Sequence, residues 1–95
     1  MTVQFHPAAQ DEFVETVDFY EGRGADLGQQ FRDAVRAGLD RIVAHPELGA
    51  LRRATRRLMV DGFPYDVVYR VHADAIEVLA LAHHRRRPGY WRRRV

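Results

Sequence analysis

Two segments in the N-terminal half carry apolar residues at intervals of three or four, the period of one face of an α-helix. The first segment has the series Ala9, Phe13, Val17 and Tyr20. The second segment has the series Leu27, Phe31, Ala34, Val35, Gly38 and Ile42. Pro7 suits the first turn of a helix, and residues 22–24, with two glycines, suit its end. The second helix should end before Pro46. The pattern therefore predicts two helices in an antiparallel hairpin.

The apolar period changes to two in the C-terminal half, which indicates β-strands. Residues 58–60 place two apolar side chains on one face, and residues 65–71 alternate over a longer stretch. Residues 76–82 are apolar at nearly every position, which predicts a central strand covered on both faces. A short alternating strand at residues 3–5 precedes the first helix. We predict one α+β domain spanning the whole chain, in the order β-α-α-β-β-β, with the helical hairpin on one face of a largely antiparallel sheet.

Strict alternation assigns the side chains of these strands to the two faces of the sheet. On the strand at 65–71, the residues expected to face the helices are Tyr65, Val67, Tyr69 and Val71. On the last strand, the residues expected to face the helices are Ile76, Val78, Ala80 and Ala82. The open face then receives Glu77, Leu79, Leu81 and His83 from the last strand. We therefore expect Arg57, Arg70 and His83 to lie together on the open face, above an apolar floor of Leu79 and Leu81.

Charge is distributed unevenly along the 95 residues. Residues 1–50 carry four arginines against nine carboxylates, and residues 51–95 carry eleven arginines against four carboxylates. The net charge of +2 is thus the sum of −5 for residues 1–50 and +7 for residues 51–95. All 15 basic residues are arginine, whose planar guanidinium binds phosphate or carboxylate with paired hydrogen bonds. The C-terminal half is therefore expected to present a basic surface to an acidic partner.

Several classes of protein are not expected. The chain has no cysteine, so it has neither disulfides nor thiolate ligands for zinc. Its first residues show neither the basic nor the apolar region of a secretory signal, and no apolar run approaches the ~20 residues that span a membrane. No histidine, aspartate or glutamate has a metal-ligand spacing, and no glycine-rich phosphate loop occurs. We expect a cytoplasmic protein with no metal, no cofactor and no membrane contact.

The expected open face has two interpretations. With Tyr90, Trp91 and the arginines at 85–87 beside it, it resembles a surface for phosphates and stacked bases. In the alternative interpretation, Arg57 and Arg70 pair with nearby carboxylates, and His83 only caps the sheet. The two aromatic residues then fill the core, and the arginine triplets form a solvated tail.

Motifs distributed along the whole chain resemble the RelE/ParE superfamily, the toxins of bacterial type II toxin–antitoxin modules. In the N-terminal half they are Phe5-His6-Pro7-Ala8-Ala9, Glu12, Phe19-Tyr20-Glu21 and Leu27-Gly28-Gln29-Gln30-Phe31. In the C-terminal half they are Arg57-Leu58, residues 63–69, residues 76–83 and Arg86-Arg87-Pro88-Gly89-Tyr90-Trp91. The resemblance implies a sheet backed by a helical hairpin and a partner antitoxin that wraps the toxin.

The resemblance also implies one of two mechanisms. RelE-like members cleave mRNA in the ribosome without a metal, and here His83 and Tyr90 would transfer protons while Arg57 and Arg70 stabilise the phosphate. ParE-like members inhibit DNA gyrase and do not cleave RNA. RelE-like sites often contain lysine, which this chain lacks. The Phe-Pro-Tyr segment and the Arg-Pro-Gly-Tyr-Trp ending are closer to ParE-like and plasmid-stabilisation members, so we favour gyrase inhibition over mRNA cleavage.

For target binding, the candidate residues are Arg56, Arg85, Arg86, Arg87 and Trp91. If these carry the gyrase contact, Trp91→Ala combined with removal of residues 92–95 should weaken gyrase inhibition and leave the fold intact.

Overall fold

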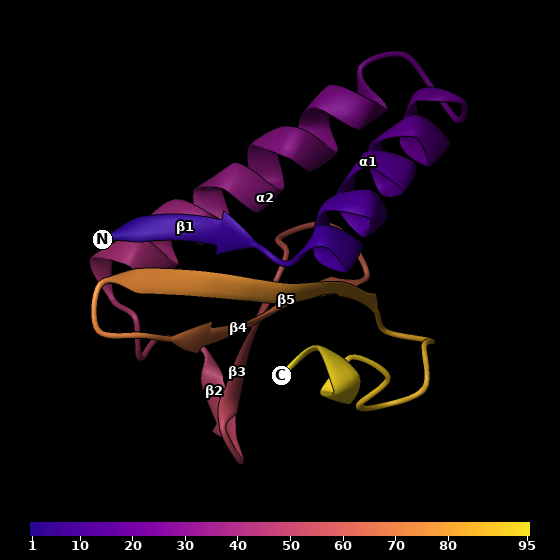
Figure 1. Ribbon diagram of the computed structural model, residues 1–95. Helices are drawn as coiled ribbons and strands as arrows, with labels where there is room; N and C mark the ends of the chain where they lie inside the picture. The colour runs from indigo at the N-terminus through magenta and orange to yellow at the C-terminus, as the bar shows by residue number, and fades with distance from the viewer.

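A single sheet of five strands runs through the computed structural model, which describes residues 1–95 (Figure 1). The elements are β1 (Thr2–Phe5), α1 (Pro7–Glu21), α2 (Leu27–Ala44), β2 (Ala50–Arg52), β3 (Thr55–Met59), β4 (Tyr65–Val71), β5 (Ala75–His83) and the short 3-10 helix η1 (Arg92–Arg94). The strand order is β1-β5-β4-β3-β2. β1 is parallel to β5, and every other pairing is antiparallel. The predicted α+β class is confirmed.

The two helices occupy the residues that the apolar period predicted. α1 begins at Pro7, and the Nδ1 atom of His6 accepts a hydrogen bond of 3.1 Å from the backbone N–H of Ala8, which caps the helix. α2 ends at Ala44, just before the restricted position that precedes Pro46. Both helices lie on one face of the sheet (Figure 1). Neither is long and apolar enough to cross a membrane.

Strand β2 was not predicted. It has only three residues, all of them exposed, so it shows no alternation of apolar and polar positions. It forms a hairpin with β3 in which Arg52 pairs with Thr55, leaving Arg53 and Ala54 as the two-residue turn. Arg53 has φ 57°, in the left-handed region that glycine usually occupies in such turns.

A β-bulge in β5 reverses the predicted facing of its second half. Val68 pairs with Ala80, but Tyr69 pairs with Val78, so Leu79 is an extra residue opposite β4. Residues before the bulge face as predicted. The predicted facing is wrong for residues 80–83. An uninterrupted apolar run carries no polar position that would reveal this change of phase.

The two faces of the sheet therefore bury separate apolar clusters. On the helix side lie Ala9, Val17, Phe31, Val35, Ile42, Val60, Val67, Tyr69, Ile76, Val78 and Leu81. On the other side lie Val68, Leu79, Ala80, Ala82 and Trp91. Figure 1 shows the C-terminal segment, in yellow, crossing the face of the sheet opposite the helices. The face that was expected to be open is thus covered in part by C-terminal residues.

Candidate target-binding surface

Glu12 reaches from α1 to the edge of β5 beyond the end of β1. The last backbone hydrogen bond between the N-terminal strand region and β5 joins the N–H of His6 to the carbonyl of Val78. Farther along, Glu12 accepts a hydrogen bond of 3.1 Å from the N–H of Leu81, and Arg94 donates one of 2.9 Å to the carbonyl of Leu79. Side chains thus satisfy backbone groups that a neighbouring strand would otherwise bind.

The same carboxylate holds the C-terminal segment. Arg94 donates to both oxygens of Glu12, at 2.9 and 3.0 Å, and the hydroxyl of Tyr90 donates to Glu12 at 2.9 Å. Burial, followed by the hydrogen bond to Glu12, raises the pKa of Tyr90. The same carboxylate raises the pKa of Arg94. The Tyr90 hydroxyl is therefore a poor acid, and its proton is committed to a structural contact.

Trp91 anchors the segment on the sheet. Its side chain is only 5% exposed and packs against the cluster on the face opposite the helices. The guanidinium of Arg57 lies 5.0 Å from the centre of the Trp91 ring. Arg57 forms no ion pair, and its distance from the ring is within the range of a cation–π interaction. Trp91 is thus a plug of the core, one of the two roles considered for it.

One hollow beside Arg57, which we name the arginine pocket, has a volume of about 220 Å³. It lies between the β2–β3 turn and the C-terminal segment. Its walls include Arg52, Arg53, Thr55, Arg57, Trp91 and Arg92, and no aspartate or glutamate. The pocket therefore concentrates positive charge.

A second hollow, the histidine pocket, lies on the other side of Arg57 and has a volume of about 250 Å³. Its walls include Arg57, Asp66, His83, His84, Arg86 and Tyr90. The Nε2 atom of His84 lies 3.0 Å from a carboxylate oxygen of Asp66. This pocket therefore contains a negative charge next to its cations.

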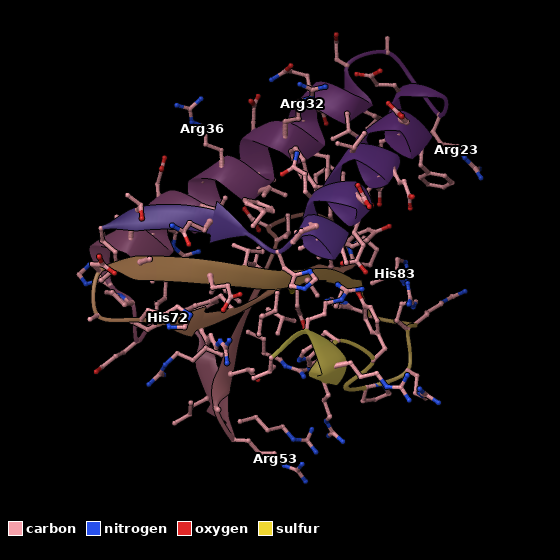
Figure 2. All side chains as sticks on the ribbon, viewed as in Figure 1. Arg23, Arg32, Arg36, Arg53, His72 and His83 are labelled. Atoms are coloured by element: carbon pink, nitrogen blue, oxygen red, sulfur yellow. The ribbon has the colours of Figure 1, made fainter.

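Three of the four candidate catalytic residues, Arg57, His83 and Tyr90, line the histidine pocket, and Arg70 lies outside it. Arg70 is bound to Glu77 at 2.8 Å, and His72 contacts the same carboxylate at 2.9 Å (His72 is labelled in Figure 2). The hydrogen bond from His72, together with Arg70, lowers the pKa of Glu77. Pairing with Glu77 was one of the two interpretations considered for Arg70, and the structure confirms it.

His83 lies on the helix side of the sheet because the bulge turns it there. Its ring packs edge-on against Tyr65, with ring centres 4.9 Å apart, and its Nδ1 atom accepts a hydrogen bond of 3.0 Å from the N–H of Arg85. Figure 2 shows it at the end of β5 next to α1. The side chain that shares a face with Asp66 is instead that of His84. The prediction that Arg57, Arg70 and His83 lie together is wrong for Arg70, whereas Arg57 and His83 line the same pocket.

The candidate target-binding arginines have different environments. Arg56 donates to the carbonyls of Glu47 and Gly49, at 3.0 and 2.9 Å, and so fixes the loop before β2. Arg86 lies 3.9 Å above the ring of Tyr90. Arg85 and Arg87 are exposed and form no ion pair. Arg85, Arg86 and Arg87 are therefore accessible to a target, whereas Arg56 is committed to the fold.

Sequence reasoning missed the central role of Glu12. A signal was present, because Glu12 lies three residues after Ala9 and four before Thr16, both of which are buried on α1. A carboxylate on the buried side of a helix needs a partner. Arg94 could not be identified as that partner, since nothing local links residues 82 positions apart.

Comparisons with known proteins agree with this architecture. A family model described as "ParE toxin of type II toxin-antitoxin system, parDE" matches residues 3–88. A solved structure titled "Chromosomal ParDE TA system from P. aeruginosa" superposes with a TM-score of 0.63 at 18% sequence identity, covering 87% of this chain and 95% of that chain. At this identity the superposition supports the fold alone. No curated protein matches the chain.

Proposed function

The chain belongs to the ParE family, the toxins of type II toxin–antitoxin systems, and from this premise we propose that it arrests growth by inhibiting DNA gyrase without cleaving RNA. Membership of the family makes an antitoxin its partner. The proposal adds the target, and it puts the protein in the cytoplasm, where gyrase and its DNA are found. The proposal also includes a hetero-oligomer formed by the toxin and its antitoxin.

The observation that carries the proposal is the pairing of Asp66 with His84 in the histidine pocket. Cleavage of RNA at the 2′-hydroxyl requires a base, an acid and cations around the phosphate. A carboxylate in the pocket repels a phosphate, and the bond to Asp66 engages one of the two ring nitrogens of His84. Of the two candidate proton-transfer groups in this pocket, Tyr90 is held by Glu12, and the Nδ1 atom of His83 is engaged by the N–H of Arg85. This arrangement supports binding to a target more than it supports chemistry.

The alternative is cleavage of mRNA on the ribosome. One observation favours it: Arg57 and Arg86 line the same pocket as both histidines. In that mechanism, His83→Gln abolishes cleavage and preserves binding to the ribosome.

The two functions are separated by measuring both readouts. Purified toxin is added to gyrase with relaxed plasmid and ATP, and reporter mRNA is examined in cells arrested by induced expression. We expect loss of supercoiling, accumulation of linear plasmid, and intact mRNA. Breaks in mRNA at codon spacing, with normal supercoiling, would overturn the proposal.

Two controls sharpen this test. Coexpression of the cognate antitoxin should restore growth and supercoiling together. Tyr90→Phe removes the hydroxyl that a nuclease would need, so a gyrase inhibitor keeps its toxicity when that substitution is made. Arrest that disappears with Tyr90→Phe in a variant that remains folded supports the nuclease instead.

A further inference from the structure

The arginine pocket gathers four arginines whose guanidinium groups have no carboxylate partner within the protein. They are Arg52, Arg53, Arg57 and Arg92, and none of them makes an ion pair. Val95 also lines the pocket, and it forms no ion pair with them. Like charges held this close repel one another, and a bound anion relieves that repulsion. Only Arg70 and Arg94 among the arginines of the chain have a carboxylate partner.

The backbone at Arg53 is an independent observation. Arg53 has φ 57°, a conformation that an L-residue adopts at a cost and glycine adopts freely. A glycine would thus make a better turn between β2 and β3. Arg53 therefore contributes its guanidinium group to the pocket and does not favour the conformation of the turn.

The pocket is continuous with more basic surface. A neighbouring hollow is lined by Arg87, Arg92 and Arg93, so Arg92 belongs to both hollows. Figure 2 shows Arg53 at the tip of the β2–β3 hairpin, far from Arg32 and Arg36 on α2. Positive charge therefore extends from the hairpin tip across the C-terminal segment. A strip of this kind suits successive phosphates of a nucleic-acid backbone.

The aromatic residues beside the pocket indicate which nucleic acid fits. Binding of single strands uses exposed rings on which bases stack. Trp91 is only 5% exposed, and Arg86 covers the ring of Tyr90 at 3.9 Å. Neither ring is free to receive a base. Phosphate contacts without stacking are typical of binding to duplex DNA independently of sequence.

We propose that the arginine pocket and its extension bind backbone phosphates of duplex DNA. The inference rests on the proposed function in one respect, namely that the bound DNA is the duplex on which gyrase acts. The DNA-binding step itself is a property of the toxin and is measured without gyrase.

The test is fluorescence anisotropy with a short labelled DNA duplex, in two unrelated sequences, over a range of salt concentrations. We expect similar affinity for both sequences and a steep loss of affinity with salt. Arg52→Gln combined with Arg53→Gly should lower the affinity about tenfold or more and reduce the slope of log affinity against log salt by roughly one per arginine. Arg53→Gly removes the guanidinium while leaving a residue that suits the turn, so the variant should fold normally.

Arg32→Gln combined with Arg36→Gln is the matched control, because both arginines are exposed on α2 and the change in net charge is the same. Its affinity should remain within about twofold of the original chain. If the two double variants bind DNA equally, the assignment of the site is wrong. Stronger binding to a single strand, or to a poly-glutamate peptide, would also overturn it.

The outcome with gyrase is scored separately. If the hairpin variant loses both DNA binding and gyrase inhibition, the proposal and its link to gyrase are both supported. If DNA binding is lost and inhibition persists, the proposed function stands and the link to gyrase falls. If the unaltered toxin binds DNA as expected and gyrase is unaffected, the proposed function falls and the DNA site stands.

Discussion

Glu12 and Arg94, separated by 82 positions in the chain, are joined by two hydrogen bonds of 2.9 and 3.0 Å. Their side chains are 15% and 17% exposed, so water screens the pair only partly. The pair connects the first helix to the last turn of the chain and holds the C-terminal segment against the sheet. The walls of the arginine pocket depend on it, because Trp91 and Arg92 belong to that segment.

Glu12→Gln should destabilise the protein by about 2 to 3 kcal/mol, because Arg94 loses its counter-charge in a mostly buried site. For a domain of this size, the loss corresponds to a fall in Tm of roughly 10–20 °C. Thermal unfolding followed by circular dichroism measures it. Glu15→Gln is the control on the same helix, since Glu15 is exposed and unpaired. Equal Tm values for the two variants would contradict a structural role for Glu12.

Tyr90→Phe should cost about 1 kcal/mol near neutral pH, the contribution of one ordinary hydrogen bond. The raised pKa of Tyr90 stabilises the fold fully below pH 10.0, the ordinary value for tyrosine, and this stabilisation is lost as pH rises further, because the unfolded chain releases the proton first. The difference between the two proteins should therefore shrink above about pH 10. Urea unfolding midpoints measured across this range test it. A difference that grows with pH would show that Tyr90 does not donate to Glu12.

Glu77→Gln should make the free energy of unfolding depend less on pH in the acid range. The lowered pKa of Glu77 stabilises the fold above its ordinary value of 4.5, and the stabilisation is lost as pH falls through the folded-state pKa. The original chain should thus lose stability below about pH 5 more steeply than the variant. Unfolding midpoints in urea provide the measurement. Asp74→Asn, at an exposed position that forms no ion pair, should leave the slope unchanged.

Trp91→Ala should destabilise the fold by roughly 3 to 5 kcal/mol, because it removes the largest side chain of one apolar cluster. The sequence predicted that this change, combined with removal of residues 92–95, would spare the fold. Burial of Trp91 and the bond from Arg94 to Glu12 contradict that expectation. Denaturant unfolding measures the loss, and Trp91→Phe, which refills part of the space, should recover some of it. Full stability of the alanine variant would mean that the C-terminal segment does not pack on the sheet.

The sequence predicted the helices and the long strands because each repeats an apolar period over several turns or residue pairs. It did not predict β2, where three exposed residues leave no pattern. It misplaced residues 80–83 because residues 78–82 are all apolar, and a bulge inside such a run leaves no mark in the sequence. The ion pair of Arg70 with Glu77 was one of two alternatives that only coordinates separate.

Contacts that join distant parts of the chain account for the rest of the site. The alternation placed Arg57 on the correct face, but the arginine pocket is completed by a hairpin turn and a C-terminal segment that meet only in the folded chain. The sequence marks Glu12 only as one of the family motifs, and its partners lie at the other end of the chain.

The extra residue in β5 also determines how this chain corresponds to its relatives. A column of a sequence alignment equates residues by their order along the chain, whereas a bulge changes which side of the sheet each later residue occupies. Where a relative has an unbroken strand, the counterpart of a side chain on its exposed face is His84 rather than His83. Residues of two family members at this edge should therefore be matched by the face of the sheet that their side chains occupy. Matching them by alignment column alone would assign the role of His84 to His83.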